Sequence, residues 1–432
     1  MFQHVFRPLA WTLSLLGLSG LSLTSCPTQP TNPPDPATLT EEYTTCTEVW
    51  LRVSVPDTAR QAGLRVYRDD SLLVNFPVAP TDTVVIDPGL QPNTTYSYHT
   101  VRLRDNDEQS PSEPLNVTTL PTTSHDFTWT IDTLGSSQYG YGSSDLNDVA
   151  ILDQDNIWTV GDIQMDSGRF NLAKWDGEQW RLSNVGPVGN VLTSIFAFST
   201  NNVWVANLCS PFHWDGTTWT YYRFSSGGVG VNTCAGNVMW GSSSSNMYFV
   251  GMNGSIVHYD GATFTRLASG TQTTIQDIWG ARNPQTDDWT ILCTAAPGFG
   301  GSHFEIYQIT NSQTVTVVPG VTDRVARSVW FDDPRLIYTS GSGIFRKLSG
   351  KGWEEIGGIA VIPATTRRIR GMALNDLFVV SDFGHIAHYN GVDFRVWRPN
   401  PAVIYSSCAY RDGVMVAVGF DGRQAFVVRM QR

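Results

Sequence analysis

The chain has 432 residues and a formal net charge of −11, with 41% hydrophobic and 16% charged residues. The acidic balance argues against nucleic acid or anionic lipid headgroups as the main partner. Gly, Thr, Ser and Val are abundant, Trp is frequent with 15 residues, and long amphipathic helical stretches are absent, so the composition predicts an all-β protein with room for two domains.

The N-terminal residues are predicted to form a targeting signal. Residues 1–25 contain Arg7, an apolar run too short for a conventional membrane span, and then Leu23-Thr24-Ser25 directly before Cys26. This arrangement resembles the bacterial lipobox, in which the cysteine is lipidated and becomes the mature N-terminus. The resemblance assigns lipidation to Cys26. The alternative is an ordinary secretory signal with an incidental cysteine.

Residues 26–43 are expected to form a tether. Five prolines fall between Pro27 and Thr40, and no aromatic residue interrupts them. Such a segment is extended and holds a folded part away from a membrane.

Five cysteines follow Cys26, with no Cys-x-x-Cys spacing that would indicate a zinc or thioredoxin-like motif. Most are expected to be buried small apolar residues. Cys209 and Cys234 would pair if their loops meet on one face.

Residues 44–121 are predicted to form a seven-stranded sandwich, because short alternating apolar runs are separated by turn residues. Leu90-Gln91-Pro92-Asn93-Thr94-Thr95-Tyr96 resembles the Leu-x-Pro-x-Thr-x-Tyr motif of fibronectin type III modules. The resemblance implies an immunoglobulin-like fold in which Tyr96 is the tyrosine-corner residue. It makes Trp50 the candidate for the buried strand-B tryptophan.

Residues 122–432 carry a repeat of about 40–50 residues. Its clearest copies are Trp175-Asp176-Gly177-Glu178-Gln179-Trp180, Trp214-Asp215-Gly216-Thr217-Thr218-Trp219, Tyr259-Asp260-Gly261-Ala262-Thr263-Phe264 and Tyr389-Asn390-Gly391-Val392-Asp393-Phe394. Asp-Gly and Asn-Gly predict hairpins with type I′ turns, and two more strands fit between copies. One four-stranded sheet per period is typical of a β-propeller blade.

The number of blades follows from a second regularity. An interval of eight residues separates Ala150 from Trp158, and the same interval recurs from Phe196, Trp240 and Trp330. The second-strand positions are Trp158, Trp204, Tyr248, Trp289, Tyr338, Phe378 and Val416, which predicts seven blades. The last blade has only three strands, and the segment from Phe127 to Ile131 resembles a fourth strand. The N-terminal segment is therefore expected to close the ring.

A residue that recurs at the same position in every repeat is better explained by packing than by catalysis or metal binding. The hairpin tryptophans are expected to pack between blades. The histidines that precede a hairpin aromatic (His213, His258 and His388) are expected to belong to the packing of the repeat and not to a metal site. The hairpin turns loosely resemble the Asp box of sialidases, but the adjacent Asp and Gly depart from its pattern. Catalytic residues, metal ligands and cofactor motifs are not identified, although enzymatic activity stays open.

The candidate binding residues lie in loops expected on one face of the channel. They are Arg324, Arg327, Arg367, Arg370, His303, Tyr139 and Tyr141. Guanidinium groups bind carboxylate or sulfate bidentately. The alternative is that these arginines pair with Asp323, Asp332 and other acids in a solvated channel.

As a whole, the chain resembles surface lipoproteins of environmental bacteria that join a fibronectin-like module to a propeller of Trp-Asp-Gly-x-x-Trp repeats. Some relatives are labelled glucosyl transferase, but no nucleotide-sugar motif supports that chemistry here. The resemblance favours a monomeric, non-catalytic protein of the outer membrane or cell surface, held in the membrane only by its lipid. Its expected partner is an extracellular or periplasmic glycan or protein. The alternatives are a carbohydrate-active enzyme and an envelope assembly scaffold.

Overall fold

The computed structural model describes residues 35–55, 63–104, 107–135, 144–224, 228–284, 286–297, 305–312, 314–318 and 325–432. Cys26, Tyr139, Tyr141, His303 and Arg324 lie outside this part of the chain. The protein divides into two compact units, the second of which also takes in residues 43–49 and 86–95. Both units are built of strands, and the helical segments described are two 3-10 turns, η2 (Met252–Gly254) and η3 (Asp382–Gly384).

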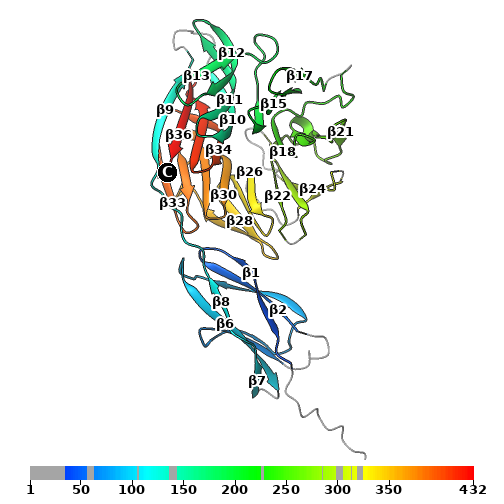
Figure 1. Cartoon of the computed structure of the whole chain (residues 1–432), viewed down its shortest axis with the longest axis vertical. Helices are drawn as coiled ribbons and strands as arrows, with labels where there is room; N and C mark the ends of the chain where they lie inside the picture. Colours follow the sequence, from blue (N-terminus) through cyan, green and yellow to red (C-terminus); the bar gives the residue numbers. More distant parts are fainter. Residues whose placement is uncertain are drawn as a thin grey trace, which may run out of the picture. The chain divides into compact units, whose positions relative to one another are not determined.

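The first unit contains two sheets (Figure 1). The three-stranded sheet has the order β1-β2-β5 and comprises β1 (Thr38–Thr44), β2 (Glu48–Ser54) and β5 (Asp82–Pro88). The other has the order β4-β3-β6-β7, with β8 also pairing with β6. Its strands are β3 (Leu64–Arg68), β4 (Ser71–Phe76), β6 (Thr95–Arg104), β7 (Asp107–Pro111) and β8 (Leu115–Thr118).

Two sequence expectations for this unit change. The described residues form eight strands instead of seven, because β7 and β8 both pair with β6. In addition, β1 begins at Thr38, so the end of the segment predicted as a tether is a strand.

The described residues of the second unit form seven four-stranded sheets. The first three are β10 (Asp145–Asp153), β11 (Asn156–Met165), β12 (Gly168–Trp175) and β13 (Trp180–Ser183); β14 (Ser194–Ser199), β15 (Asn202–Asn207), β16 (Ser210–Trp214) and β17 (Trp219–Tyr221); and β18 (Val238–Ser243), β19 (Asn246–Val250), β20 (Ile256–Tyr259) and β21 (Phe264–Leu267). The next three are β22 (Ile275–Arg282), β23 (Trp289–Ala295), β24 (Glu305–Thr310) and β25 (Thr314–Val317); β26 (Ala326–Asp333), β27 (Leu336–Gly341), β28 (Ile344–Leu348) and β29 (Trp353–Gly357); and β30 (Thr366–Ala373), β31 (Asp376–Ser381), β32 (Ile386–Tyr389) and β33 (Phe394–Trp397). The last combines β34 (Ile404–Arg411), β35 (Val414–Phe420) and β36 (Ala425–Gln431) with β9 (Thr128–Leu134).

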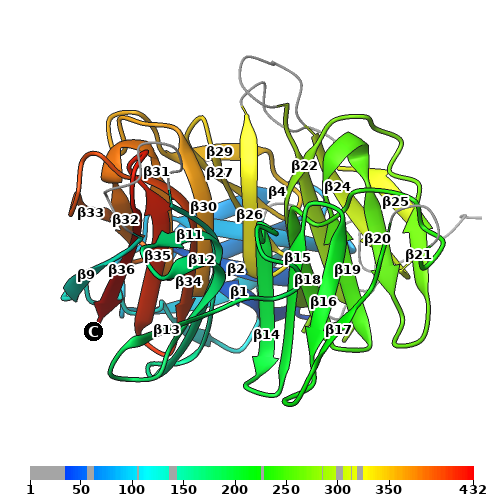
Figure 2. The same cartoon turned by 90° about the horizontal axis from the view of Figure 1, so that it is seen from above.

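These sheets form a propeller-like ring. The first strand of each sheet contacts the first strand of the next, from β10 through β34, and β34 in turn contacts β10. Figure 2 shows the sheets following one another in chain order, from green through yellow and orange to red. The first strands therefore line the centre of the ring.

The eight-residue interval seen in the sequence is a strand register. Ala150 pairs with Trp158 and Trp240 with Tyr248, directly opposite one another in the first and second strands. Trp330 pairs with Tyr338 in the same way. A constant interval in the sequence is therefore a constant hairpin in the structure.

The Asp-Gly turns differ from the predicted type I′ geometry. Trp175 pairs with Trp180, which leaves a four-residue loop in which only Gly177 has a positive φ, of 95°. The Asp176 carboxylate accepts hydrogen bonds from the backbone N–H groups of Glu178 and Gln179 at 3.1 and 2.9 Å. Because the side chain caps the loop, the aspartate needs no left-handed backbone. The other three clear copies share this arrangement.

The histidines that precede the hairpin aromatics pack inside their sheets. His213 stacks on Trp204, with ring centroids 4.4 Å apart, and its Nε2 lies 2.9 Å from Oδ1 of Asn202. His258 and His388 contact second-strand rings and a second-strand Asn or Asp in the same way. These histidines belong to the packing of the repeat, as the sequence indicated.

The ring is closed by a strand from the other end of the chain. β9 pairs antiparallel with β36, as the sequence predicted, from Thr128 opposite Gln431 to Leu134 opposite Ala425. Figures 1 and 2 show β9 in cyan beside red β36. Phe127, directly before β9, is 8% exposed and meets Phe378 edge-on at 5.0 Å.

One disulfide joins two neighbouring sheets. Cys209 lies in the turn between β15 and β16, and Cys234 precedes β18. The pairing left open by the sequence is therefore present. The remaining described cysteines, Cys46, Cys293 and Cys408, are free and buried.

We predict that closure depends on Phe127 and less on the exposed Trp129. Phe127→Ala should lower the free energy of unfolding by about 3–5 kcal/mol, the usual cost of removing a buried aromatic ring. Trp129→Ala should cost clearly less, because 44% of Trp129 is exposed. Urea denaturation followed by tryptophan fluorescence measures both variants. Equal losses would show that closure rests on the strand pairing alone.

We also predict that stability declines in weak acid. Burial lowers the pKa of His213, His258 and His388 below the ordinary value of 6.5. Below pH 6.5 these histidines therefore bind protons in the unfolded chain before they do so in the folded chain. The free energy of unfolding keeps its full histidine contribution above pH 6.5 and loses it as the pH falls.

Urea midpoints measured from about pH 8 to about pH 5 test this pH dependence. Replacing all three histidines by Gln should flatten the decline, whatever its effect on stability at pH 8. An unchanged slope in the triple variant would contradict the assignment.

Candidate functional site in the central channel

The channel is ringed by buried polar residues that follow a local irregularity. Five first strands carry a register shift near their start, and the residue after the shift is polar and buried. These residues, with Ser194 of β14, form what we call the belt: Asp148, Ser194, Asp277, Ser328, Arg368 and Ser407. Bulges of this kind re-aim side chains at a sheet end.

Asp148 joins three sheets. Its Oδ2 accepts a hydrogen bond from the backbone N–H of Ile195 in the next sheet at 3.0 Å. Its Oδ1 accepts from the hydroxyl of Ser407 in the last sheet at 2.7 Å and from the Val149 N–H at 3.0 Å. This carboxylate thus ties the first sheet to its neighbours on both sides.

Asp277 has the same function on the opposite half of the ring. It is 0% exposed and accepts two hydrogen bonds from Arg370, at 2.8 and 2.9 Å, and one from the Val329 N–H at 3.1 Å. Arg368 and Ser328 also donate to it. Burial alone would raise the pKa of Asp277, but the two guanidinium groups outweigh burial and hold the pKa below its ordinary range.

The chemistry of these two carboxylates is structural. Each accepts at least three hydrogen bonds, and at least two of them come from other sheets. Asp277 is held ionised, so it is a poor proton donor, and its lone pairs are already in use. Within the described residues, three or more His, Cys, Asp or Glu side chains do not gather into a metal-binding group.

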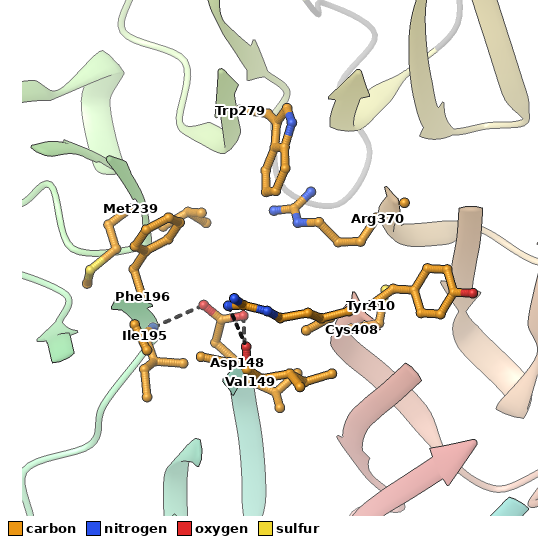
Figure 3. Close-up of a pocket in the computed structure, with 16 residues that line it drawn as sticks. Asp148, Val149, Ile195, Phe196, Met239, Trp279, Arg370, Cys408 and Tyr410 are labelled. Carbon is orange, nitrogen blue, oxygen red and sulfur yellow. Dashed lines mark hydrogen bonds between the residues drawn. The ribbon is translucent and has the colours of Figure 1, made fainter. Parts of the chain in front are cut away.

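A cavity of about 250 Å³ lies inside the ring. Its wall comes from the first strands of six sheets, and Figure 3 shows Trp279 and Arg370 side by side, with Phe196 and Met239 across from them. The Arg370 guanidinium lies 4.8 Å from the centroid of the Trp279 ring. Arg411, from β34, adds a half-exposed cation to the wall.

The belt divides the arginines that the sequence grouped together. Arg370 follows the belt in its strand and lines the cavity, where its guanidinium donates two hydrogen bonds to the Asp277 carboxylate. Arg327 and Arg367 precede the belt residues and occupy the bulges of β26 and β30. Arg367 pairs with Asp382 at 2.7 Å, so among the described residues Arg370 pairs with Asp277 and Arg367 with Asp382, while Asp323 lies outside the described part of the chain.

The sequence reasoning missed Asp148 and Asp277. A signal was present, because a polar residue stands two positions before the first member of several eight-residue intervals. Asp148 precedes Ala150 in this way, and Ser194 and Ser328 are its equivalents in their sheets. Aligning the repeats on that position would have found the belt.

We predict that removing the charge of Asp277 destabilises the ring strongly. Asp277→Asn keeps the shape but leaves Arg368 and Arg370 without their counter-charge, which should cost about 3–5 kcal/mol. The control is Asp412→Asn, since Asp412 is 72% exposed and lies 3.5 Å from Arg411. Exposed pairs contribute about 0–1 kcal/mol. Similar urea midpoints for the two variants would contradict the structural assignment of Asp277.

Helical segments with the length and apolar character to cross a membrane are absent from the part of the chain described here. The sequence matches no protein-family profile and no curated protein.

Solved structures resemble the chain. YCF48 bound to D1 peptide gives a TM-score of 0.53 at 13% identity, covering 72% of this chain and 97% of that one. YCF48 from Cyanidioschyzon merolae gives 0.50 at 14% identity, with 70% and 98% covered. The WD40 β-propeller domain of Doa1 gives 0.48 at 12% identity, with 69% and 96% covered. The likeness to the two YCF48 structures identifies the fold as all-β and propeller-like.

Proposed function

We propose that this chain is a non-catalytic binding protein of the bacterial cell envelope, which takes a glycan or protein ligand through the channel of a seven-bladed propeller. The seven four-stranded sheets and the ring of contacts between their first strands support the blade count. In this proposal a lipid on Cys26 anchors the chain in the membrane.

The first unit is proposed to be a fibronectin type III-like spacer. Its strands divide into a three-stranded and a larger sheet, as in that family of sandwiches. Trp50, the candidate strand-B tryptophan, lies in the second strand and is 1% exposed. Tyr96, the proposed tyrosine-corner residue, is the second residue of β6 and lies in the same strand as the buried Tyr98.

The cavity in the channel is the observation that carries the proposed function. It is lined by aromatic and apolar side chains with a few charged groups, the usual composition of a binding site. The carboxylates nearest to it are engaged between blades and are poorly placed as general acids. A binding role therefore fits this site better than a carbohydrate-active enzyme, which is the alternative.

A protein ligand or an assembly scaffold is the second candidate. YCF48, which shares the fold, has been solved bound to a D1 peptide, so one propeller of this type carries a polypeptide. The charge of −11 does not decide between a glycan and a protein partner.

Filling the cavity tests the proposal. Ala197 lines the cavity, and Ala197→Phe adds a ring there, whereas Ala262→Phe adds the same ring at an exposed hairpin turn. We expect the parent protein to bind members of a panel of neutral and acidic oligosaccharides and peptides. Ala197→Phe should weaken that binding by about tenfold or more, equivalent to 1.4 kcal/mol, and Ala262→Phe should not. Equal affinities for the two variants would refute a channel site.

A further inference from the structure

Phe383 has a backbone conformation that its side chain does not favour. It lies in the η3 turn between β31 and β32 with φ 58° and ψ 31°, in the left-handed region. Its side chain is 57% exposed, so burial of the ring does not compensate for this conformation. A bulky residue with positive φ is a genuine outlier, and such outliers concentrate at ligand-binding sites.

The same turn exists elsewhere in the ring without this strain. In the third sheet, η2 joins β19 to β20 and places Asn253 at φ 52° and ψ 39°. Asparagine tolerates the left-handed region because its short side chain bonds locally. The turn itself therefore does not require an aromatic residue, and Phe383 needs a separate explanation.

The turn around Phe383 is held firmly. The Arg398 Nε donates to the Phe383 carbonyl at 2.8 Å, and the Asp382 N–H donates to the Thr365 carbonyl at 3.2 Å. A Cβ at Gly384 would lie 1.9 Å from the Asn400 carbonyl oxygen, so the turn packs tightly against that loop. The exposed ring is thus presented to solvent from a fixed backbone.

The charges beside this ring are unbalanced. Arg367 donates to Asp382 at 2.7 Å, while the buried Nε of Arg327 has no hydrogen-bond partner. Burial lowers the pKa of Arg327 and the neighbouring Arg367 lowers it further, with Asp382 opposing them. Counting Arg398, the described residues of this cluster hold three guanidinium groups and one carboxylate. A bound anion would restore the balance.

We propose that Phe383, Arg327 and Arg367 form a subsite for a uronic acid residue of an anionic glycan. The sugar ring packs its C–H face on Phe383, and its carboxylate binds the two guanidinium groups. Asp382 accepts a sugar hydroxyl. The inference rests on the proposed binding function and names its ligand class.

The mixture of groups favours a sugar acid over an acidic peptide. The arginine donors come from β26 and β30, and the carboxylate acceptor and the exposed aromatic ring are adjacent residues of the η3 turn. A uronic acid presents a carboxylate, hydroxyl donors and an apolar ring face within one residue. A glutamate side chain would use the arginines alone, and its carboxylate has no hydroxyl to offer Asp382.

This subsite is separate from the cavity. Arg327 and Arg367 occupy bulges before the belt, whereas the residues that line the cavity, such as Arg370 and Ala409, follow it in their strands. The subsite therefore lies toward the loops that join one blade to the next, and the cavity lies toward the hairpins between first and second strands.

Calorimetric titration of the full chain with trigalacturonate tests the proposal. Phe383→Asn copies the residue of the unstrained turn in the third sheet. It should leave the urea midpoint unchanged or raised, yet weaken trigalacturonate binding by about tenfold or more. Arg327→Gln should weaken binding similarly, because it removes the positive charge. The substitution retains an N–H donor, so the loss would report on the charge. Arg395→Gln, at an exposed arginine of β33 in the same sheet, should bind as the parent does.

Two further ligands test separately whether binding needs the carboxylate charge and the sugar ring. Methyl-esterified trigalacturonate should bind weakly, since it lacks the charge, and triglutamate should bind weakly, since it lacks the sugar ring. The proposal is overturned if trigalacturonate does not bind, if Phe383→Asn binds it as the parent does, or if triglutamate binds equally well. A different ligand whose binding is lost in Ala197→Phe would leave the channel function standing while this subsite fails.

Discussion

A sheet repeated around an axis is stable only when its last copy meets its first, because an open ring would expose a hydrophobic face and two unpaired strand edges. Here the junction is made by β9, which supplies the missing outer strand of the last sheet. Asp132 of β9 accepts hydrogen bonds from Trp180 of the first sheet and Arg429 of the last, both at 3.0 Å. The same side chain therefore links both sides of the junction.

Within that ring, the buried carboxylates of the belt have all their interactions satisfied, whereas the cluster around the η3 turn does not. Asp148 and Asp277 are saturated with hydrogen bonds and fix the spacing between first strands. By contrast, Arg327 has a buried nitrogen without a hydrogen-bond partner, and Phe383 has an unfavourable backbone conformation. Proteins retain such features where a ligand supplies the missing interaction. The contrast distinguishes framework residues from candidate binding residues.

The periodic part of this architecture is readable from the sequence. The interval from Trp330 to Tyr338 predicted a hairpin because directly opposed residues keep a fixed separation when the turn is fixed. The closing strand was predicted because the last blade had only three strands of its own in the sequence. The turn type was wrong, since the Asp176 carboxylate caps its own loop by contacts that a dipeptide preference does not contain.

The site was less predictable because it depends on exceptions to the repeat. Arg367 and Arg370 are near neighbours in sequence, but a bulge and the belt separate their environments. Phe383 resembles any exposed aromatic until its backbone is known. Arg370 could not be excluded as a ligand group from sequence, because its partner Asp277 belongs to a sheet two blades earlier.

The disulfide between Cys209 and Cys234 has a consequence for oxidative folding. Burial raises the pKa of the Cys293 and Cys408 thiols, and that of Cys46 as well, so in the folded ring few thiolates form there to attack a disulfide. Once the ring has closed, burial of Cys46, Cys293 and Cys408 protects the correct pairing from exchange with these three thiols. Before closure these three thiols are accessible, so they compete with Cys209 and Cys234 in disulfide exchange. Isomerisation to the native pair is therefore expected to finish when the first and last sheets meet.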